Sequence, residues 1–190
     1  MEKLRNYLSH FEVLTSEQFD LIAQRASRVQ LKKGEYFFKE GSIFRKAGFI
    51  TEGIVRVSQF TEKDEVTSYF LKENQFAASL ESLNDNLPAV RNLQAATNTR
   101  LIVIGYEDLQ RLTECIPPFA RIVHRIIEHT LRMKLDHRNP LVVEDAKTRY
   151  ERFAQEHADI LQRVPLGHVA SYLGITQQSL SRLRRELIRK

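Results

Sequence analysis

Several features that would indicate a secreted, membrane or low-complexity protein are missing from this 190-residue chain. Its one cysteine, Cys115, excludes an internal disulfide framework and a multi-cysteine metal or iron–sulfur cluster. Glycine and proline are scarce, at seven and five residues, which excludes collagen-like and low-complexity chains. No apolar run reaches the ~20 residues that span a bilayer, and the N-terminus lacks the apolar stretch of a signal peptide. We therefore expect a globular cytoplasmic protein without membrane contact, in which Cys115 is a small buried apolar residue.

Histidine is missing from residues 29–104, although the chain has six histidines in all. A metal-dependent enzyme built on β-strands needs clustered histidine and carboxylate ligands there. The chain also lacks a glycine-rich phosphate loop and a Gly-x-Ser-x-Gly elbow. We therefore expect no enzyme, no metal site and no cofactor. The histidines elsewhere have no special spacing and are interpreted as solvated or hydrogen-bonded, with haem ligation left open: His10, His124, His129, His137, His157 and His168.

The pattern of apolar residues changes twice along the chain, which predicts an α+β fold. Residues 1–27 have helical spacing, with one helix around Leu4 and Leu8 and another after Ser16. Residues 29–104 contain short β-branched and aromatic segments separated by turns such as Lys33-Gly34, Glu40-Gly41 and Glu52-Gly53. Many short strands with closely spaced turns are typical of a β-sandwich or roll. The segment 80–87 is expected to be a short helix or a loop.

After Ile104 the pattern is helical again, with a short helix over 106–113 and a long one that begins at Pro117-Pro118. The long helix has two apolar stripes, so one can cover the β-roll while the other meets a twin helix in a homodimer. Burial of the whole helix in one protomer is the alternative. The stripe assigned to dimerisation is Phe119, Ile122, Ile126 and Met133; the second is Val123, Ile127, Leu131 and Leu135.

Asn139-Pro140 ends the long helix and predicts a linker near 138–142. We expect a sensor domain over 1–116, a dimerisation helix over 117–138 and a DNA-binding domain over 139–190, with a helix over 144–158. The net charge of +5 lies entirely in the last part of the chain: residues 161–190 hold six basic side chains and one acidic, whereas the first 160 residues hold 23 of each. Such a basic concentration indicates a polyanionic partner or a solvated tail.

The segment 163–190, RVPLGHVASYLGITQQSLSRLRRELIRK, has the layout of a helix-turn-helix. A helix of about seven residues follows Pro165, Gly174 permits a left-handed turn, and Thr176 is a good N-cap for a second helix. Gln pairs with adenine and Arg with guanine in the major groove, while Ser and Thr reach bases or phosphates. The predicted DNA-binding residues are Thr176, Gln177, Gln178, Ser179, Ser181, Arg182, Arg184 and Arg185.

This segment resembles the family of the cyclic-AMP receptor protein and the fumarate/nitrate reduction regulator (CRP/FNR). The resemblance is strongest at VASYLGITQQSLSRLRREL and extends to KGEYFFKEG and TEGIVRVSQF. It implies a cyclic-nucleotide-binding jelly roll, a dimerisation helix and a helix-turn-helix, and it implies double-stranded DNA, a second copy and RNA polymerase as partners. By the same resemblance, Gln177, Gln178 and Arg182 occupy base-reading positions. Members of that family often have a β-hairpin wing after the recognition helix; if it is absent, its phosphate contacts must come from Arg185, Arg189 and Lys190.

The effector pocket departs from the family pattern, which has Phe-Gly-Glu followed by Arg-Ser-Ala. Here the corresponding positions lack the acceptor for the ribose and the cation for the cyclic phosphate, with Glu81 and Arg91 as the nearest substitutes. The positions of this degenerate pocket are Phe76, Ala77, Ala78, Glu81, Ala89, Val90 and Arg91. We expect a DNA-binding regulator that does not respond to cyclic AMP and whose effector is unknown. The alternative is a module that binds a small ligand and no DNA.

Overall fold

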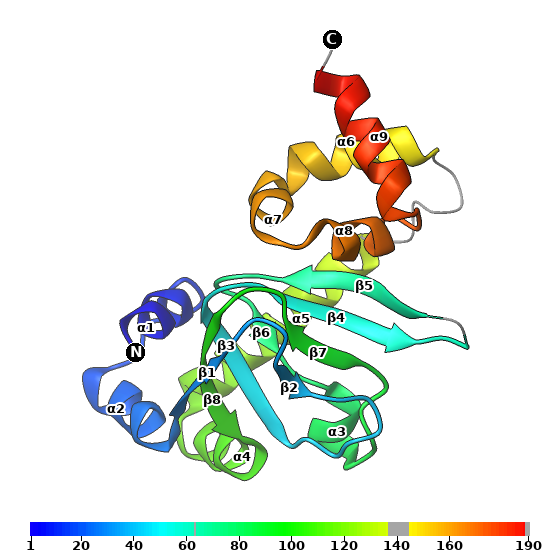
Figure 1. Cartoon of the computed structure of the whole chain (residues 1–190). Helices are drawn as coiled ribbons and strands as arrows, with labels where there is room; N and C mark the ends of the chain where they lie inside the picture. The colour runs from blue at the N-terminus through cyan, green and yellow to red at the C-terminus, as the bar shows by residue number, and fades with distance from the viewer. Residues whose placement is uncertain (63, 137–144, 189–190) are drawn as a thin grey trace.

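The computed structural model describes residues 1–62, 64–136 and 145–188, without the side chains of 133–136 and 187–188. It is an α+β molecule in which a β-roll is flanked by helices and the last helices lie together at one end (Figure 1). The helices before the gap are α1 (Glu2–Ser9), α2 (Ser16–Arg25), α3 (Leu80–Asp85), α4 (Tyr106–Cys115) and α5 (Pro117–Asp136). After it come α6 (Ala146–Glu156), α7 (Ala158–Arg163), α8 (Leu166–Tyr172) and α9 (Gln177–Ile188).

The strands form two four-stranded antiparallel sheets, ordered β1-β8-β3-β6 and β2-β7-β4-β5. Their bounds are β1 (Ser27–Leu31), β2 (Tyr36–Phe38), β3 (Lys46–Glu52), β4 (Val55–Phe60), β5 (Glu65–Leu71), β6 (Phe76–Ala77), β7 (Asn92–Ala95) and β8 (Thr99–Gly105). Each predicted strand segment contains a strand, so the predicted roll is confirmed. The two-residue β6 was not expected, because so short a strand has no alternation to detect.

Glycine at position 53 is required by the corner between β3 and β4. Its φ is +99°, in the left-handed region, and a Cβ there would lie 2.5 Å from the carbonyl oxygen of Asn98. Both observations exclude a larger residue, since only glycine adopts this conformation freely and leaves room for the neighbouring backbone. This corner lies beside the C-terminal helices, because the next residue, Ile54, is fully buried in a cluster with side chains of α6–α9.

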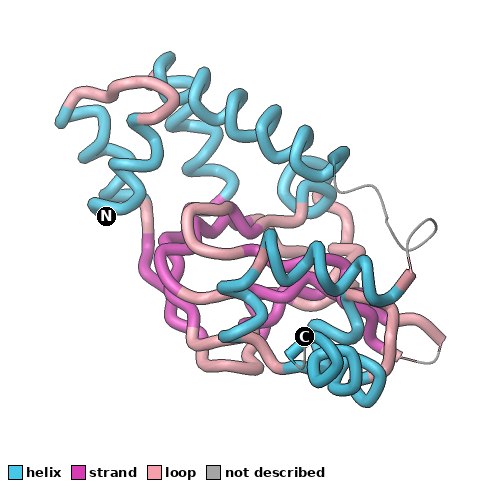
Figure 2. Tube along the Cα trace, turned by 90° about the horizontal axis from the view of Figure 1, so that it is seen from above, coloured by secondary structure: helices cyan, strands magenta, loops and turns pink. Residues whose placement is uncertain are grey.

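The N-terminal helices cover the outer face of the first sheet. Thr15 caps α2 in a reciprocal capping box with Gln18, which fixes where that helix begins. Ile22 and Ile122 are fully buried in one cluster with Phe49 of β3 and Ile102 of β8. Seen from above, helices therefore lie on both sides of the strands (Figure 2). Burying one apolar face of each helix against the sheet is what holds this layer in place.

The C-terminal helices differ in detail from the prediction. The helix expected over 144–158 is α6, whose N-cap is Asp145, bonded to the Thr148 N–H at 2.8 Å. The following α7 was not predicted. The proposed boundary at 138–142 lies outside the described residues.

Among the helices that the structure describes, none combines the length and the apolar character that a membrane span requires.

Candidate nucleic-acid interface

The helix pair α8–α9 is built as the sequence predicts. Gly174 takes a φ of +67° directly after α8, and the Ile175 N–H donates to the Ala170 carbonyl at 3.0 Å to close the turn. The Ser179 N–H donates to the Thr176 hydroxyl at 3.1 Å, so Thr176 is the N-cap of α9. Leu180 is fully buried beneath the pair. The turn and the buried leucine fix one face of α9 inward and leave the other exposed.

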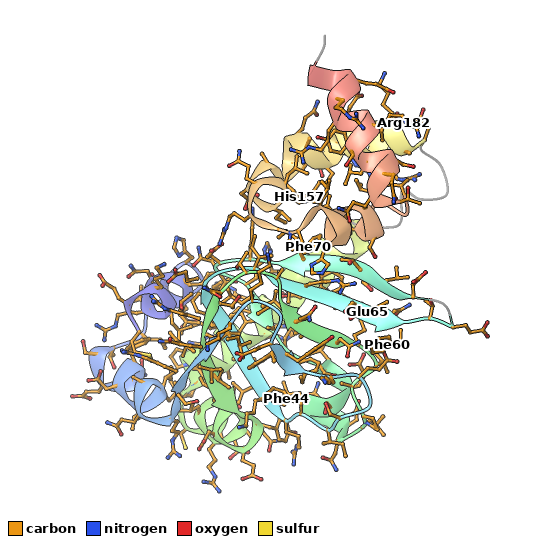
Figure 3. The ribbon with its side chains drawn as sticks, viewed as in Figure 1. Phe44, Phe60, Glu65, Phe70, His157 and Arg182 are labelled. Carbon is orange, nitrogen blue, oxygen red and sulfur yellow. The ribbon has the colours of Figure 1, made fainter. Side chains whose placement is uncertain are left out.

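The exposed face of α9 carries a shallow hollow of about 400 Å³. Side chains that can donate hydrogen bonds line it: Gln177, Gln178, Ser181, Arg182 and Arg185. Arg182 lies on α9 on the part of the molecule away from the N-terminal helices (Figure 3). Two guanidinium groups and two amides can bind base edges and phosphate oxygens together. We name this set the α9 face.

Three of the predicted DNA-binding residues lie off the α9 face or are otherwise engaged. The Thr176 hydroxyl lies 3.0 Å from the Ser179 hydroxyl, so both groups are used at the start of the helix. Arg184 is half-buried and does not line the hollow. Contacts of these three residues with DNA stay predictions. Arg189 and Lys190, which the sequence adds to the basic region, lie outside the described residues.

The charge of Arg163, which the sequence counts in the basic region, is neutralised by an ion pair that the sequence did not predict. Its guanidinium forms two hydrogen bonds with the Glu73 carboxylate, at 2.6 and 3.1 Å. A paired charge attracts a polyanion far less than a free one. No local pattern could have predicted the pair, since the two residues are 90 positions apart in the sequence.

The predicted effector residues do not form one pocket. Ala77 and Ala89 are 0% and 2% exposed and lie in the apolar cluster that fills the roll, with Phe37 and Phe38. Phe76 instead packs against Phe49 in the cluster beneath the N-terminal helices. This prediction is therefore corrected: the positions are spread over the interior, the outer face and the surface, because successive residues of a strand point to opposite faces and Phe76 and Ala77 are neighbours in β6.

The charged members of the predicted pocket lie at its margin. Glu81 is exposed in the first turn of α3 and accepts the Ser79 hydroxyl at 2.9 Å. The Arg91 guanidinium lies 5.7 Å from the centroid of the Tyr69 ring, within the range of a cation–π contact. Val90 is exposed and Ala78 half-buried. Arg91 is thus the one predicted cation near the roll, and it rests on an aromatic ring.

The stripe of α5 assigned to dimerisation is buried within the protomer. Phe119, Ile122 and Ile126 are 4%, 0% and 9% exposed, packed beneath α1, α2 and α4. They offer no surface to a second copy, so this prediction is wrong. The reason is that the N-terminal helices, rather than a twin helix, cover this face. The side chain of Met133 lies outside those described. On the other stripe, Ile127 and Leu131 are exposed by 47% and 57%.

Two smaller expectations also change. Cys115 is exposed rather than buried, and it is the last residue of α4. His168 is half-buried, and among the described residues its Nδ1 has no hydrogen-bond partner. Within the same described residues, no group of three His, Cys, Asp or Glu side chains could hold a metal ion.

Comparison with known proteins agrees with this architecture. Residues 28–114 match the family model described as the cyclic nucleotide-binding domain. The chain is 23% identical over 187 residues to the transcriptional activator protein Anr of Pseudomonas aeruginosa, covering 90% of this chain and 74% of that protein. It is 24% identical over 169 residues to the transcriptional activator protein FnrA of Stutzerimonas stutzeri, covering 80% and 67%.

A solved structure shares the fold over most of both chains. The c-di-GMP responsive global regulator CLP of Xanthomonas campestris superposes with a TM-score of 0.74 and 18% identity, covering 91% of each chain. A likeness at this identity supports the fold alone. The chain thus contains a match to the cyclic nucleotide-binding domain over residues 28–114 and is homologous to the transcriptional activators Anr and FnrA.

Proposed function

We propose that this protein is a sequence-specific DNA-binding transcription regulator in which α8 and α9 form the helix-turn-helix. The observation that carries the proposal is the α9 face: two exposed arginines and two exposed glutamines on a helix whose opposite side is anchored by Leu180. A capped helix of this size fits the major groove, where these side chains distinguish base pairs. The relatives Anr and FnrA, which are transcriptional activators by name, support the same function.

We propose that the active form is a homodimer joined through the exposed stripe of α5. Ile127 and Leu131 form an apolar strip on a 20-residue helix, and removal of such a strip from water favours association with a twin helix. A two-fold dimer would present two α9 faces, and productive binding would need them about 34 Å apart, one turn of DNA. Such a regulator acts in the cytoplasm, with RNA polymerase as a further partner by family resemblance.

We expect no response to cyclic AMP. The position of the ribose acceptor is Ala78, whose side chain cannot accept a hydrogen bond, and the position of the phosphate-binding arginine is Ala89, which lies in an apolar cluster. If the roll has an effector, it shifts the population between two arrangements of the dimer. The competing function is a module that binds a small ligand and no DNA; the family model alone is compatible with it, and the α9 face favours the regulator.

The experiment that tests this function is selection of bound sequences from a pool of random duplex DNA. We expect a two-fold symmetric site whose half-sites are about one helical turn apart. We also expect binding to unselected duplex to weaken steeply as salt rises, because each neutralised phosphate releases counterions. Failure to bind any duplex at low salt would favour the ligand-binding module, and a single asymmetric half-site would contradict the dimer.

A further inference from the structure

The C-terminal helices rest on the β4–β5 side of the roll through three kinds of contact. The first is apolar. Phe70 of β5 lies 5.8 Å from the ring of Tyr172 and 6.5 Å from that of Phe153, measured between centroids. Ile54 and Ala96, at two corners of the roll, are fully buried in the same cluster as Leu180. Figure 3 shows Phe70 where the roll meets these helices, below His157. We name this contact region the β5 seam.

The second kind of contact is ionic and lies at one end of the β5 seam. Arg163 binds Glu73 through two hydrogen bonds, and Glu73 also accepts the Gly53 N–H at 2.7 Å. Lys72 pairs with Asp159 at 2.9 Å. Burial raises the pKa of Glu73, but the hydrogen bonds from Arg163 and the backbone outweigh it and hold that pKa at about 2. The Glu73 carboxylate therefore stays ionised throughout the neutral and mildly acidic range.

The third kind of contact is polar and lies beside α8. The Thr67 N–H of β5 donates to the Ser171 hydroxyl of α8 at 2.9 Å. Next to it, Arg56 is only 4% exposed and bonds Thr67 Oγ1 at 2.8 Å and the Glu65 carboxylate at 3.0 Å. The Thr67 amide thus reports directly whether α8 is seated on the roll, since its bond partner belongs to α8.

His168 lies three residues before Ser171 in α8, on the same side of the helix, and is half-buried. Its Nδ1 is buried and has no partner among the described residues. Three charged groups act on the pKa of its imidazole: Arg56 from β4, Glu65 from β5 and Lys33 from the turn after β1. Burial lowers the pKa of His168, Arg56 and Lys33 lower it further, and Glu65 alone raises it. Glu65 is already engaged with Arg56 and with the Ser58 hydroxyl.

We propose that the β5 seam is a pH-sensitive contact that holds α9 in one position on the roll while His168 is neutral and opens when His168 is protonated. Protonation would place a second cation beside Arg56 in a region with little water, where like charges repel strongly. The predicted opening of the β5 seam does not depend on the proposed DNA-binding function. Its effect on DNA rests on the proposed function, because moving α8 moves the α9 face.

The direction of the pH effect follows from linkage. A free imidazole has a pKa of about 6.5, and the closed seam holds His168 below that value. Closure is therefore fully favoured above about pH 6.5 and is progressively lost as the pH falls below it. Glu73 cannot produce the same change, since it stays ionised in that window. The pKa of Asp159 is likewise lowered, because burial raises it but the hydrogen bond with Lys72 and the charge of Lys72 lower it more.

The test is hydrogen exchange of the Thr67 amide at single-residue resolution in the full chain, expressed as protection factors so that the intrinsic pH effect is removed. Between about pH 7.5 and pH 5.5 we expect its protection to fall by up to about tenfold, the limit for one pH unit below the free pKa. Amides in the centre of β8 should keep their protection. The variant His168→Gln, which cannot be protonated in this range, should keep the protection of Thr67 at both pH values.

Three outcomes would overturn the proposal: unchanged protection of Thr67 in the natural chain, an equal fall in His168→Gln, or a parallel fall in β8, which would indicate general unfolding. The measurement on the natural chain needs no variant, so the proposal can still be tested if His168→Gln folds poorly. Binding of random duplex DNA, measured on the same samples at both pH values, separates the two proposals. A pH-dependent seam in a protein that binds no duplex would refute the DNA-binding function and leave the seam standing.

Discussion

The interior of the β-roll and the α9 face are two places where a phosphodiester could be expected to bind, and they offer it opposite kinds of residue. Inside the roll, the position that corresponds to the family's phosphate-binding arginine is Ala89, which is packed in a cluster with Phe37 and Phe38. On α9, Arg182 and Arg185 stand exposed beside two glutamines. A phosphate needs a cation or several donors to replace its water. Of the two places, only the α9 face provides them among the described residues, which supports the proposed binding of DNA and the expectation of no response to cyclic AMP.

The largest effect is expected from placing the family's arginine back into the roll. In Ala89→Arg a guanidinium would enter an apolar cluster at a position only 2% exposed, and we expect a loss of about 3 kcal/mol or more in the free energy of unfolding. The measurement is urea denaturation. The matched control is Val90→Arg, one residue on and 55% exposed, which should change stability by less than about 0.5 kcal/mol. Equal stability of the two variants would show that the roll has room for a ligand after all.

A smaller effect is expected on the α9 face. We expect Arg182→Ala to weaken binding to the selected DNA site by about 1–3 kcal/mol and to relax the preference at one base pair. The readout is affinity for the selected site and for each single-base variant of it. Arg184→Ala is the control, because it removes the same charge from the same helix but does not line the hollow. A loss that is equal in both variants and on every sequence would mean that Arg182 contacts only phosphates.

The contrast between these regions also separates what the sequence can predict from what it cannot. The strands, the turn at Gly174 and the cap at Thr176 follow from local rules of backbone conformation and hydrogen bonding, and each is present. The α9 face follows from helical periodicity, since Leu180 marks the inner side. Turns, caps and helix faces depend on residues that are close together in the sequence, so they can be predicted from it.

Features that depend on distant partners were missed or assigned wrongly. Periodicity shows that α5 has two apolar stripes, but only packing shows that α1 and α2 cover Ile122 and leave Leu131 exposed. The pair between Arg163 and Glu73 has no local signal either, although it removes a charge from the basic region. The short α7 lacks a side-chain cap, and its N-cap, His157, is shared with the end of α6. Tertiary contacts decide such features.

The smallest effect is expected from cyclic AMP itself. A ligand that binds only the folded state stabilises it by an amount set by its concentration relative to its Kd. The cluster around Ala77 and Ala89 consists of apolar residues, so it offers no cation to the cyclic phosphate and no hydrogen-bond acceptor to the ribose. We therefore expect about 1 mM cyclic AMP to shift Tm by less than about 1 °C. Thermal unfolding with linear AMP at the same concentration controls for general ionic effects. A saturable rise of several degrees with the cyclic nucleotide alone would place a ligand in the roll, with Arg91 as the cation nearest to it, and would remove the contrast between the two regions.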